Sequence, residues 1–325
     1  MKSLVITSSP HVRSTERLTD VMYDVVIAMI PAVLVSIYFF GLHSLLITVT
    51  AVVGCVAFEA LFLKIAGKTN IRATVLDGSA IVTGILIALN LPPTSPIWMT
   101  LIGSLIAIIV AKQVFGGLGY NIFNPALVAR VFLLISFPVQ MTRWVNPSFF
   151  KGDAITAATP LGMLKTDGLA TVSKTFSHLD FFLGTIGGSL GEVSAVALLI
   201  GGLYLLMRRV ISWEIPVSML GSLFIFTGIF WMLDKAKYAD PIFHTLTGGA
   251  LLGAFFMATD MVTSPITRRG MLIFGAGIGV LTGLIRLFGG YPEGVSFAIL
   301  IMNSLVPLID KYTEVKKFGL VKVKA

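Results

Sequence analysis

From residue 21 onward the chain repeats one pattern, in which long runs of apolar residues are separated by polar links. Runs near 20 residues are long enough to cross about 30 Å of hydrocarbon as α-helices. They lack the apolar/polar alternation of membrane β-strands. The pattern predicts an all-α integral membrane protein with about ten transmembrane helices, over residues 21–40, 42–66, 75–90, 97–115, 122–137, 191–207, 215–233, 246–259, 271–288 and 294–309.

Composition agrees with this prediction, because 56% of the residues are hydrophobic and only 12% are charged. Soluble domains carry about 25% charged residues. The net charge of +8 comes from basic residues that lie mainly at the ends of the apolar runs. Such residues orient membrane proteins, so we expect a lipid bilayer and no nucleic acid as a partner.

The basic residues also predict an orientation. With a cytoplasmic N-terminus, residues 1–20 and the lysine-rich residues 310–325 share the cytoplasmic side. The opposite side keeps seven basic residues, of which four lie in the long segment 138–190, where charges weigh less in topology; the seven are Arg143, Lys151, Lys165, Lys174, Lys235, Lys237 and Arg286. Both termini are therefore predicted to be cytoplasmic, and segment 138–190 extracytoplasmic.

Several classes of site find no support. The single cysteine, Cys55, excludes an internal disulfide, and the four histidines show no metal-binding spacing. Neither a G-x-x-x-x-G-K-[ST] motif nor a Rossmann fingerprint is present. The polar residues 1–20 contain no short apolar region before a cleavage site, so we expect no removable signal peptide. We predict neither a metal site nor a catalytic residue.

The two halves of the chain resemble each other. LDGSAIVTGILIALNLPPTSP, from Leu76, resembles LTGGALLGAFFMATDMVTSP, from Leu246. Each half, 21–137 and 191–309, holds five apolar runs, so equivalent runs must cross in opposite directions. The sequence thus predicts two inverted five-helix repeats, an architecture that places a site near the midplane where the halves meet.

The third and eighth runs are the shortest, and each ends in a polar stretch that contains proline. Interrupted segments in equivalent positions are typical of a functional site in inverted repeats. The alternative is two short, tilted helices that pack through their glycines.

Four acidic residues are candidates for an ion pathway, because ionisable groups are costly in hydrocarbon. They are Asp24, Glu59, Asp77 and Asp260. Asp77 could instead cap the third helix, and Glu59 could reach the membrane surface or pair with a neighbouring subunit. Arg130 lies within the fifth run.

The long segment 138–190 contains GDAITAAT, which matches the pattern D-x-x-[ST]-[GA]-A-T at Asp153, Thr156, Ala157, Ala158 and Thr159. This pattern resembles the acceptor sequence for covalent flavinylation, in which a flavin transferase moves FMN from FAD onto the last threonine. The acceptor hydroxyl is expected to lie unhindered on a flexible, exposed strip. The alternative is an ordinary loop rich in threonine and alanine.

The whole chain resembles the RnfD/NqrB family, the membrane flavoprotein subunits of the Rnf and sodium-pumping NADH:quinone oxidoreductase complexes. The resemblance is carried, in chain order, by DVVIAMIPA, LNLPP, AKQVFGGLGYNIFNPALVARVFL, GSLGEVSAVALLIGGLYLL, FFMATDMVTSP and YPEGVSFAILIMNSLVPLIDKY. The first run begins near residue 21, whereas an NqrB-like chain is expected to have a longer N-terminal extension associated with quinone use. The chain therefore resembles the RnfD branch more closely.

The resemblance implies specific cofactors. Thr159 would carry FMN through a phosphoester, with Asp153, Thr156 and Ala158 as its recognition sequence. Asn121 and Asn124 would lie at a second, non-covalent riboflavin, although Asn124 before Pro125 could equally be a helix N-cap. Asp260 could meet either a flavin or a cation.

The resemblance also implies a function, that of an electron-transfer subunit in an ion-translocating (Na⁺ or H⁺) ferredoxin:NAD⁺ oxidoreductase of a bacterial cytoplasmic membrane. The subunit would be incomplete alone. Its partners would include a second subunit with covalent FMN, iron–sulfur subunits and, during maturation, a flavin transferase. Two alternatives stay open, an NqrB-like subunit that reduces quinone and a transporter or channel without redox function.

Overall fold

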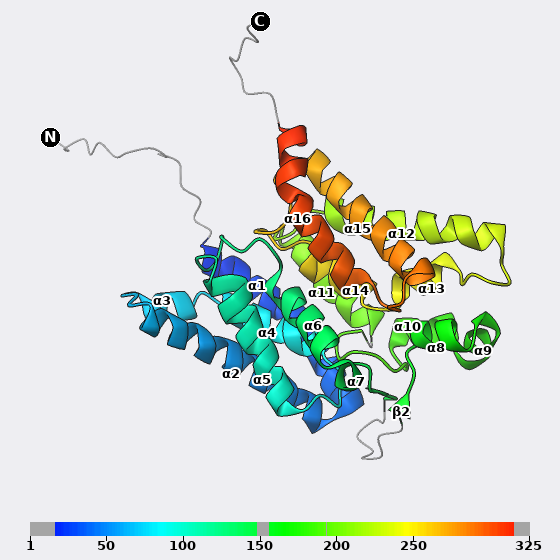
Figure 1. The fold of residues 1–325 in the computed structure, drawn as a ribbon, viewed down its shortest axis with the longest axis horizontal. Helices are drawn as coiled ribbons and strands as arrows, with labels where there is room; N and C mark the ends of the chain where they lie inside the picture. Colours follow the sequence, from blue (N-terminus) through cyan, green and yellow to red (C-terminus); the bar gives the residue numbers. More distant parts are fainter. Residues whose placement is uncertain (1–16, 148–155, 193, 315–325) are drawn as a thin grey trace, which may run out of the picture.

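A computed structural model describes residues 17–147, 156–192 and 194–314, and nearly all of their regular structure is helical (Figure 1). The first half contains α1 (Leu18–Phe40), α2 (Leu42–Ile65), α3 (Ile71–Val75), α4 (Ser79–Asn90), α5 (Ile97–Leu105), the π-helix η1 (Ile106–Gln113) and α6 (Pro125–Ser136). The second half contains α11 (Ala195–Met207), α12 (Glu214–Leu233), α13 (Pro241–Leu246), α14 (Ala250–Leu252), the π-helix η2 (Gly253–Met257), α15 (Arg268–Phe288) and α16 (Val295–Thr313).

The segment between the halves is more structured than a loop. It holds α7 (Pro138–Met141), β1 (Trp144–Val145), β2 (Thr156–Ala157), α8 (Pro160–Thr166), α9 (Leu169–Thr175) and α10 (His178–Leu183). The two-residue strands pair antiparallel, with Trp144 opposite Ala157. They are the only departure from the predicted all-α class among the described residues.

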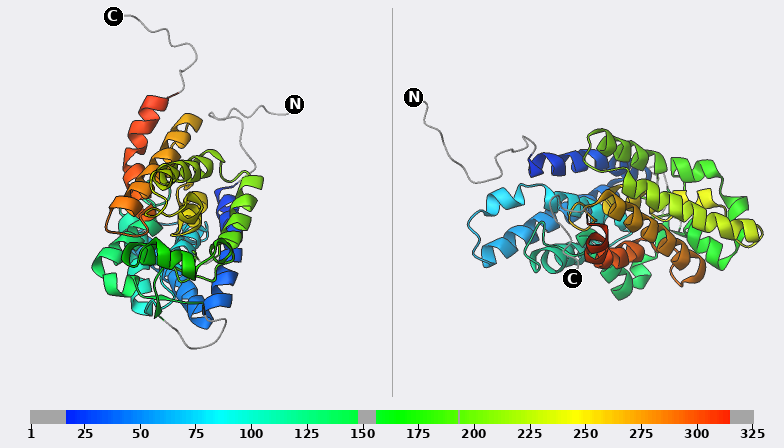
Figure 2. Two further views of the ribbon diagram at one scale, coloured as in Figure 1. Left: turned by 90° about the vertical axis from the view of Figure 1, so that its right-hand side faces the viewer. Right: turned by 90° about the horizontal axis from the view of Figure 1, so that it is seen from above.

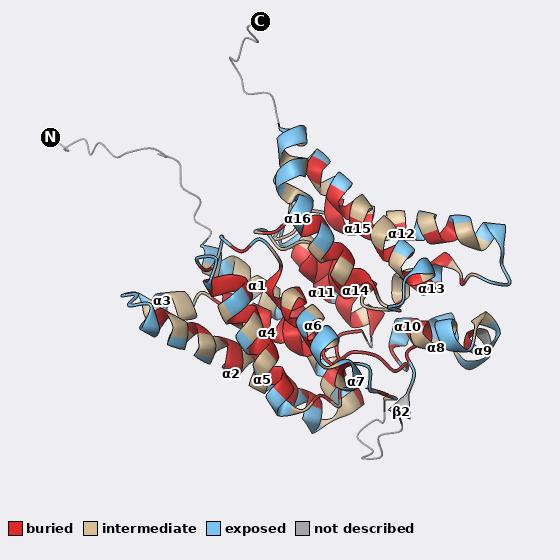
Figure 3. Cartoon of the chain, in the orientation of Figure 1, coloured by how far each residue is buried: buried red, intermediate tan, exposed pale blue. Residues whose placement is uncertain are grey.

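Six helical stretches in the described residues are long and apolar enough to cross a membrane: Leu18–Phe40, Leu42–Ile65, Ile71–Asn90, Glu214–Leu233, Arg268–Phe288 and Val295–Thr313. Many large apolar side chains on these helices face outward, among them Leu34, Val53 and Ile225. Figure 3 shows that residues between the helices are buried, whereas many on the outer faces of the helices are exposed. An outer surface of this kind suits contact with lipid, so the chain is a multi-pass membrane protein.

Both ends of the described chain lie at the same end of the helix bundle. Figure 1 shows the first turn of α1 and the last turn of α16 at one end, and β2 with α8 to α10 at the other. The views in Figure 2 agree with this arrangement. The segment that carries Thr159 is therefore separated from the N-terminal end of α1 by the length of the bundle.

Small residues allow the helices to pack closely, both between the halves and within one half. A Cβ atom placed on Gly201 of α11 would lie 2.1 Å from the carbonyl oxygen of Ala28 in α1. Within the second half, a Cβ on Gly279 of α15 would lie 2.0 Å from Oγ of Ser222 in α12. Only glycine permits such short distances between helices, as is common where helices associate within a membrane.

Each half of the chain contains a short, mostly buried helical stretch. α4 has 12 residues, and α14 with η2 covers Ala250–Met257. Each follows a glycine in the left-handed region, Gly78 at φ 89° and Gly249 at φ 67°. At 1.5 Å per residue neither is by itself long enough to cross about 30 Å, and α4 reaches that length only together with α3, in the stretch Ile71–Asn90. Their C-terminal ends meet, because Nδ2 of Asn90 lies 3.8 Å from Sδ of Met257.

Candidate functional site

Thr159 is the N-cap of α8 and is buried. Its Oγ1 accepts a hydrogen bond of 3.0 Å from the backbone N–H of Gly162, and Pro160 occupies the first helical position. This is the usual arrangement of a threonine N-cap. Thr159 is only 6% exposed, whereas the preceding Ala158 is exposed. The expectation of an unhindered acceptor hydroxyl is therefore wrong for this conformation, because the hydroxyl satisfies the helix start and packs inside.

The rest of the predicted flavinylation sequence is only partly visible. Asp153 lies outside the described residues. Thr156 belongs to β2, where it pairs with Val145 of β1. The strand pair and the cap of α8 thus fix the backbone on both sides of Ala158.

A small pocket surrounds Thr159. It is lined by Thr159, Pro160, Leu161, Ile186, Gly187, Glu192, Thr247, Gly248 and Glu293. Behind its wall, Arg286 donates hydrogen bonds to the carbonyl oxygens of Thr247 (2.9 Å) and Gly248 (3.0 Å). The sequence interpretation placed Arg286 among the extracytoplasmic topology charges, but it is 4% exposed and organises this loop instead.

Arg130 forms the ionic centre of the same region. Its guanidinium contacts the carboxylate of Glu293 and the side-chain oxygen of Asn90, and it lies 3.8 Å from Oε1 of Glu192. Arg130 is 7% exposed. The arginine thereby joins α4 and α6 to the loops before α11 and α16, and it compensates the two acids that face Thr159.

Glu59 is fully buried and pairs within its own chain. Its Oε1 accepts hydrogen bonds from Nζ of Lys112 at 2.6 Å and from Nε2 of Gln113 at 2.7 Å. Its exposure is 0%, so neither the surface position nor the pairing with a neighbouring subunit, the two alternatives considered for Glu59, is observed. Lys112 is a buried partner that sequence reasoning missed, because a lysine three residues before the end of an apolar run resembles an ordinary terminal charge.

Asp77 is connected to this ion pair through Ser79. Its Oδ1 accepts the backbone N–H of Ser79 at 2.7 Å and the Ser79 hydroxyl at 2.5 Å. Oγ of Ser79 in turn accepts from Nζ of Lys112 at 2.6 Å. Asp77 thus binds the first N–H of α4, as the capping alternative proposed, and also joins a buried network with Glu59.

Asp24 lies apart from this network. Its Oδ1 accepts from the Tyr204 hydroxyl at 2.8 Å, and its Oδ2 accepts from Arg208 at 3.1 Å. These contacts join α1 to α11. The four acids predicted as an ion pathway therefore do not form one continuous row in this structure.

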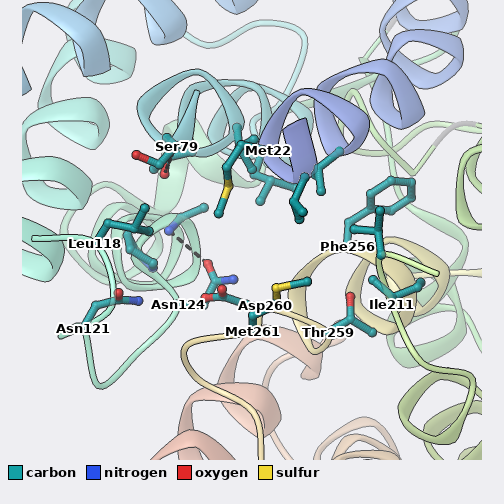
Figure 4. A pocket seen from close by; sticks show the side chains of 18 of the residues that line it. Met22, Ser79, Leu118, Asn121, Asn124, Ile211, Phe256, Thr259, Asp260 and Met261 are labelled. Carbon is teal, nitrogen blue, oxygen red and sulfur yellow. Dashed lines mark hydrogen bonds between the residues drawn. The ribbon is translucent and has the colours of Figure 1, made fainter. Parts of the chain in front are cut away.

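A pocket of about 790 Å³, open space at its mouth included, lies where the two halves meet. Lys112, Asn121, Asn124 and Asp260 line it. Figure 4 shows Ser79, Leu118 and Asn121 on one side and Ile211, Phe256 and Thr259 on the other, with Asn124 and Asp260 between them. The structure thus brings together both predicted asparagines and one predicted acid.

Asn124 is the N-cap that the sequence allowed. Its Oδ1 accepts from the backbone N–H groups of Ala126 (3.1 Å) and Leu127 (3.3 Å). Its Nδ2 donates to the carbonyl oxygen of Met257 at 3.2 Å, so it also joins α6 to the end of η2. Asn121 donates to the carbonyl oxygen of Phe123 at 3.2 Å. Both asparagines therefore hold the wall of the pocket in place.

Comparison with known proteins identifies the family. The model of the NQR2, RnfD, RnfE family matches residues 5–319. The chain belongs to this family. This confirms the resemblance found in the sequence.

Relatives in the family are similar over nearly their whole length. The chain is 47% identical over 319 residues to a subunit of the proton-translocating ferredoxin:NAD(+) oxidoreductase complex of Clostridium ljungdahlii, covering 97% of this chain and 96% of that one. It is 45% identical over 324 residues to a subunit of the Na(+)-translocating ferredoxin:NAD(+) oxidoreductase complex of Acetobacterium woodii, covering 99% and 97%. It is 42% identical over 334 residues to a subunit of the ion-translocating oxidoreductase complex of Alcanivorax borkumensis, covering 98% and 97%.

The pocket between the halves has the lining of a small-molecule site. Its walls are mainly apolar, with a few amide and hydroxyl groups, as in most small-molecule sites. The charged residues that line it are Lys112 and Asp260, of opposite sign. This lining therefore offers no excess of positive charge for a phosphate group.

Proposed function

We propose that the chain is an electron-transfer subunit of an ion-translocating ferredoxin:NAD⁺ oxidoreductase complex in a bacterial cytoplasmic membrane. The observation that carries this proposal is the similarity, over 97% to 99% of the chain, to subunits of two ferredoxin:NAD(+) oxidoreductase complexes. One of these relatives is named for protons and the other for Na⁺, so the coupling ion stays open. Other subunits of the complex, iron–sulfur subunits and a second subunit with covalent FMN among them, are its partners.

The proposed cofactor on Thr159 is FMN in phosphoester linkage. The flavin would supply the redox chemistry, and the protein would position it. In the N-cap, Oγ1 of Thr159 accepts a hydrogen bond. Esterification would replace the hydroxyl hydrogen and leave this oxygen able to accept, so the N-cap could still form. Because Thr159 is 6% exposed, the flavin transferase must act while α8 is not yet packed.

A second, non-covalent riboflavin is proposed for the pocket between the halves. Asn121 and Asn124 would hold it, with Lys112 and Asp260 at its polar edge. Val21 and Met22, at the start of α1, line this pocket, whereas α8 lies at the other end of the bundle (Figure 1). Two flavins so placed would support electron transfer across the membrane.

The proposed architecture is two inverted five-helix repeats with ten crossings and both termini in the cytoplasm. Its support is the pair of short elements, α4 and α14 with η2, each preceded by a glycine with positive φ. Broken helices that meet at the interface of two repeats are typical of this architecture.

The covalent flavin can be tested on the full-length chain produced with a flavin transferase. The chain should fluoresce in a denaturing gel, and its intact mass should exceed that of the polypeptide by FMN less one water. Thr159→Ala should lose both signals, whereas Thr175→Ala, an exposed threonine of α9 outside the recognition sequence, is the matched control and should keep the flavin. An unmodified mass for the parent chain would falsify the covalent-flavin proposal. Fluorescence retained in Thr159→Ala would overturn only the residue assignment.

A further inference from the structure

The buried ion pair Glu59–Lys112 has a direction relative to the pocket between the halves. Lys112 lines the pocket and Glu59 does not. The Glu59 carboxylate, which is fully buried, lies 2.6 Å from Nζ of Lys112 and is not part of the pocket wall. The pair therefore acts as a dipole whose positive end faces the pocket.

The position of this positive charge is well defined. Nζ of Lys112 donates to Glu59 and, at 2.6 Å, to Oγ of Ser79, which donates in turn to Asp77. Gln113 holds the same Glu59 oxygen at 2.7 Å. A buried lysine in such contacts is held in one place, and in a medium of low dielectric its field acts more strongly than it would in water.

The charged group that opposes Lys112 in the pocket comes from the second half of the chain. Asp260 lines the same cavity, and its carboxylate is held by the Thr263 hydroxyl at 3.2 Å and by the backbone N–H of Val262 at 3.4 Å. Lys112 and Asp260 thus face one ligand space from the two halves, and a ligand that gains charge there will respond to both.

We propose that Lys112 faces the electron-rich edge of a flavin ring in this pocket and makes that flavin easier to reduce. This inference rests on the proposed riboflavin and names the residue that sets its redox equilibrium. The role of Glu59 is to hold Lys112 and to moderate its charge, so the two residues act in opposite directions.

The chemistry follows from the charge that reduction creates. An isoalloxazine ring that takes up two electrons and one proton at N5 carries one net negative charge, shared by N1 and the C2 carbonyl oxygen. The electrons come from another flavin or an iron–sulfur centre of the complex, or from dithionite in a titration. A fixed cation at that edge stabilises the reduced ring more than the neutral oxidised ring, as charge near N1 does in flavoproteins generally.

The test uses the full-length chain in detergent with the Thr159→Ala substitution, so that flavin held without a covalent bond is observed alone. Bound riboflavin is extracted with acid and quantified, and its reduction is followed by absorbance during a dithionite titration against reference dyes. Lys112→Met should lower the two-electron reduction constant at least tenfold, which is about 30 mV. Glu59→Gln should raise it, and Lys112→Arg, which keeps the charge, should stay close to the parent.

A purely structural role would not give opposite signs for the two partners. The proposed role of Lys112 is wrong if Lys112→Met and Glu59→Gln change the reduction constant in the same direction. It is also wrong if both variants leave the constant unchanged with riboflavin still bound. If the parent chain yields no extractable riboflavin, the second flavin is wrong and the inference fails with it. Should Lys112→Met fold poorly, the comparison of Glu59→Gln with Glu59→Gln/Lys112→Met removes the lysine charge without leaving a buried carboxylate unpaired.

Discussion

Arg130 is the residue on which separate parts of the chain converge. It contacts Asn90 and Glu293, which lie 40 and 163 positions away in the sequence, and it lies near Glu192. All of these groups are buried or half-buried. Charges in such places require partners, because removal of one partner leaves an uncompensated charge in a medium of low dielectric.

Arg130→Met should therefore destabilise the chain by about 3–5 kcal/mol, the usual cost of breaking a buried ion pair on one side. The measurement is the midpoint of thermal unfolding in detergent, followed by intrinsic tryptophan fluorescence. The control is Arg130→Met/Glu293→Gln, which should recover part of the loss because it removes one of the unpaired carboxylates. An unchanged midpoint in the single variant would show that the ion pair contributes nothing to stability.

At the scale of elements, the short helices of the segment between the halves depend on their caps. α10 begins with a capping box, in which the Asp180 carboxylate accepts from the backbone N–H of Ser177 at 2.8 Å and from the Thr185 hydroxyl at 2.8 Å. The Ser177 N–H is the main cause that lowers the pKa of Asp180, with the Thr185 hydroxyl next. A helix of six residues has few other hydrogen bonds of its own.

A group whose pKa is lower in the folded than in the unfolded state stabilises the fold above its unfolded pKa, near 3.9 for aspartate. This contribution is lost as the pH falls through the folded pKa. Hydrogen exchange in α10 should therefore become faster, relative to α15, as the pH falls below about 4. Asp180→Asn should raise exchange in α10 at neutral pH about two- to fivefold, as expected for a lost cap, and should remove the acid-dependent step. A step of equal size in the variant would assign it to another group.

On the scale of the whole molecule, the two candidate flavin sites lie toward opposite ends of one bundle. The pocket between the halves is lined by residues at the start of α1 and after the end of α11, and α8, whose N-cap is Thr159, lies at the other end (Figure 1). The proposed electron path crosses the membrane only if these two ends of the bundle face opposite sides of it.

The orientation can be tested with single cysteines. Cys55 is fully buried, so the parent chain should react little with a membrane-impermeant maleimide. Lys174→Cys in α9 should be labelled in intact cells, and Lys68→Cys, between α2 and α3, should be labelled only after the membrane is opened; both lysines are exposed. The reverse pattern would place Thr159 in the cytoplasm and overturn the predicted topology.

The features that could be predicted from the sequence depend on residues that are neighbours in the chain. Run length and hydropathy identify membrane helices because every backbone polar group in lipid must be satisfied within its own segment. A helix start such as Asn124–Pro125 was recognisable as an N-cap because capping involves neighbours in the chain. The family membership likewise followed from motifs spread along the chain, and it was confirmed over residues 5–319.

Contacts between distant segments lay beyond such reasoning. Lys112 and Glu59 are 53 positions apart, and Asn124 and Met257 are 133 apart, so only helix packing could bring them together. The same packing buries Arg286 and Thr159, which the linear pattern placed in exposed segments. The membrane helices and the motif around Thr159 could be recognised in the chain alone, because they depend on neighbouring residues. The buried charge pairs and the pocket between the halves emerged only in three dimensions, because they depend on contacts between distant helices.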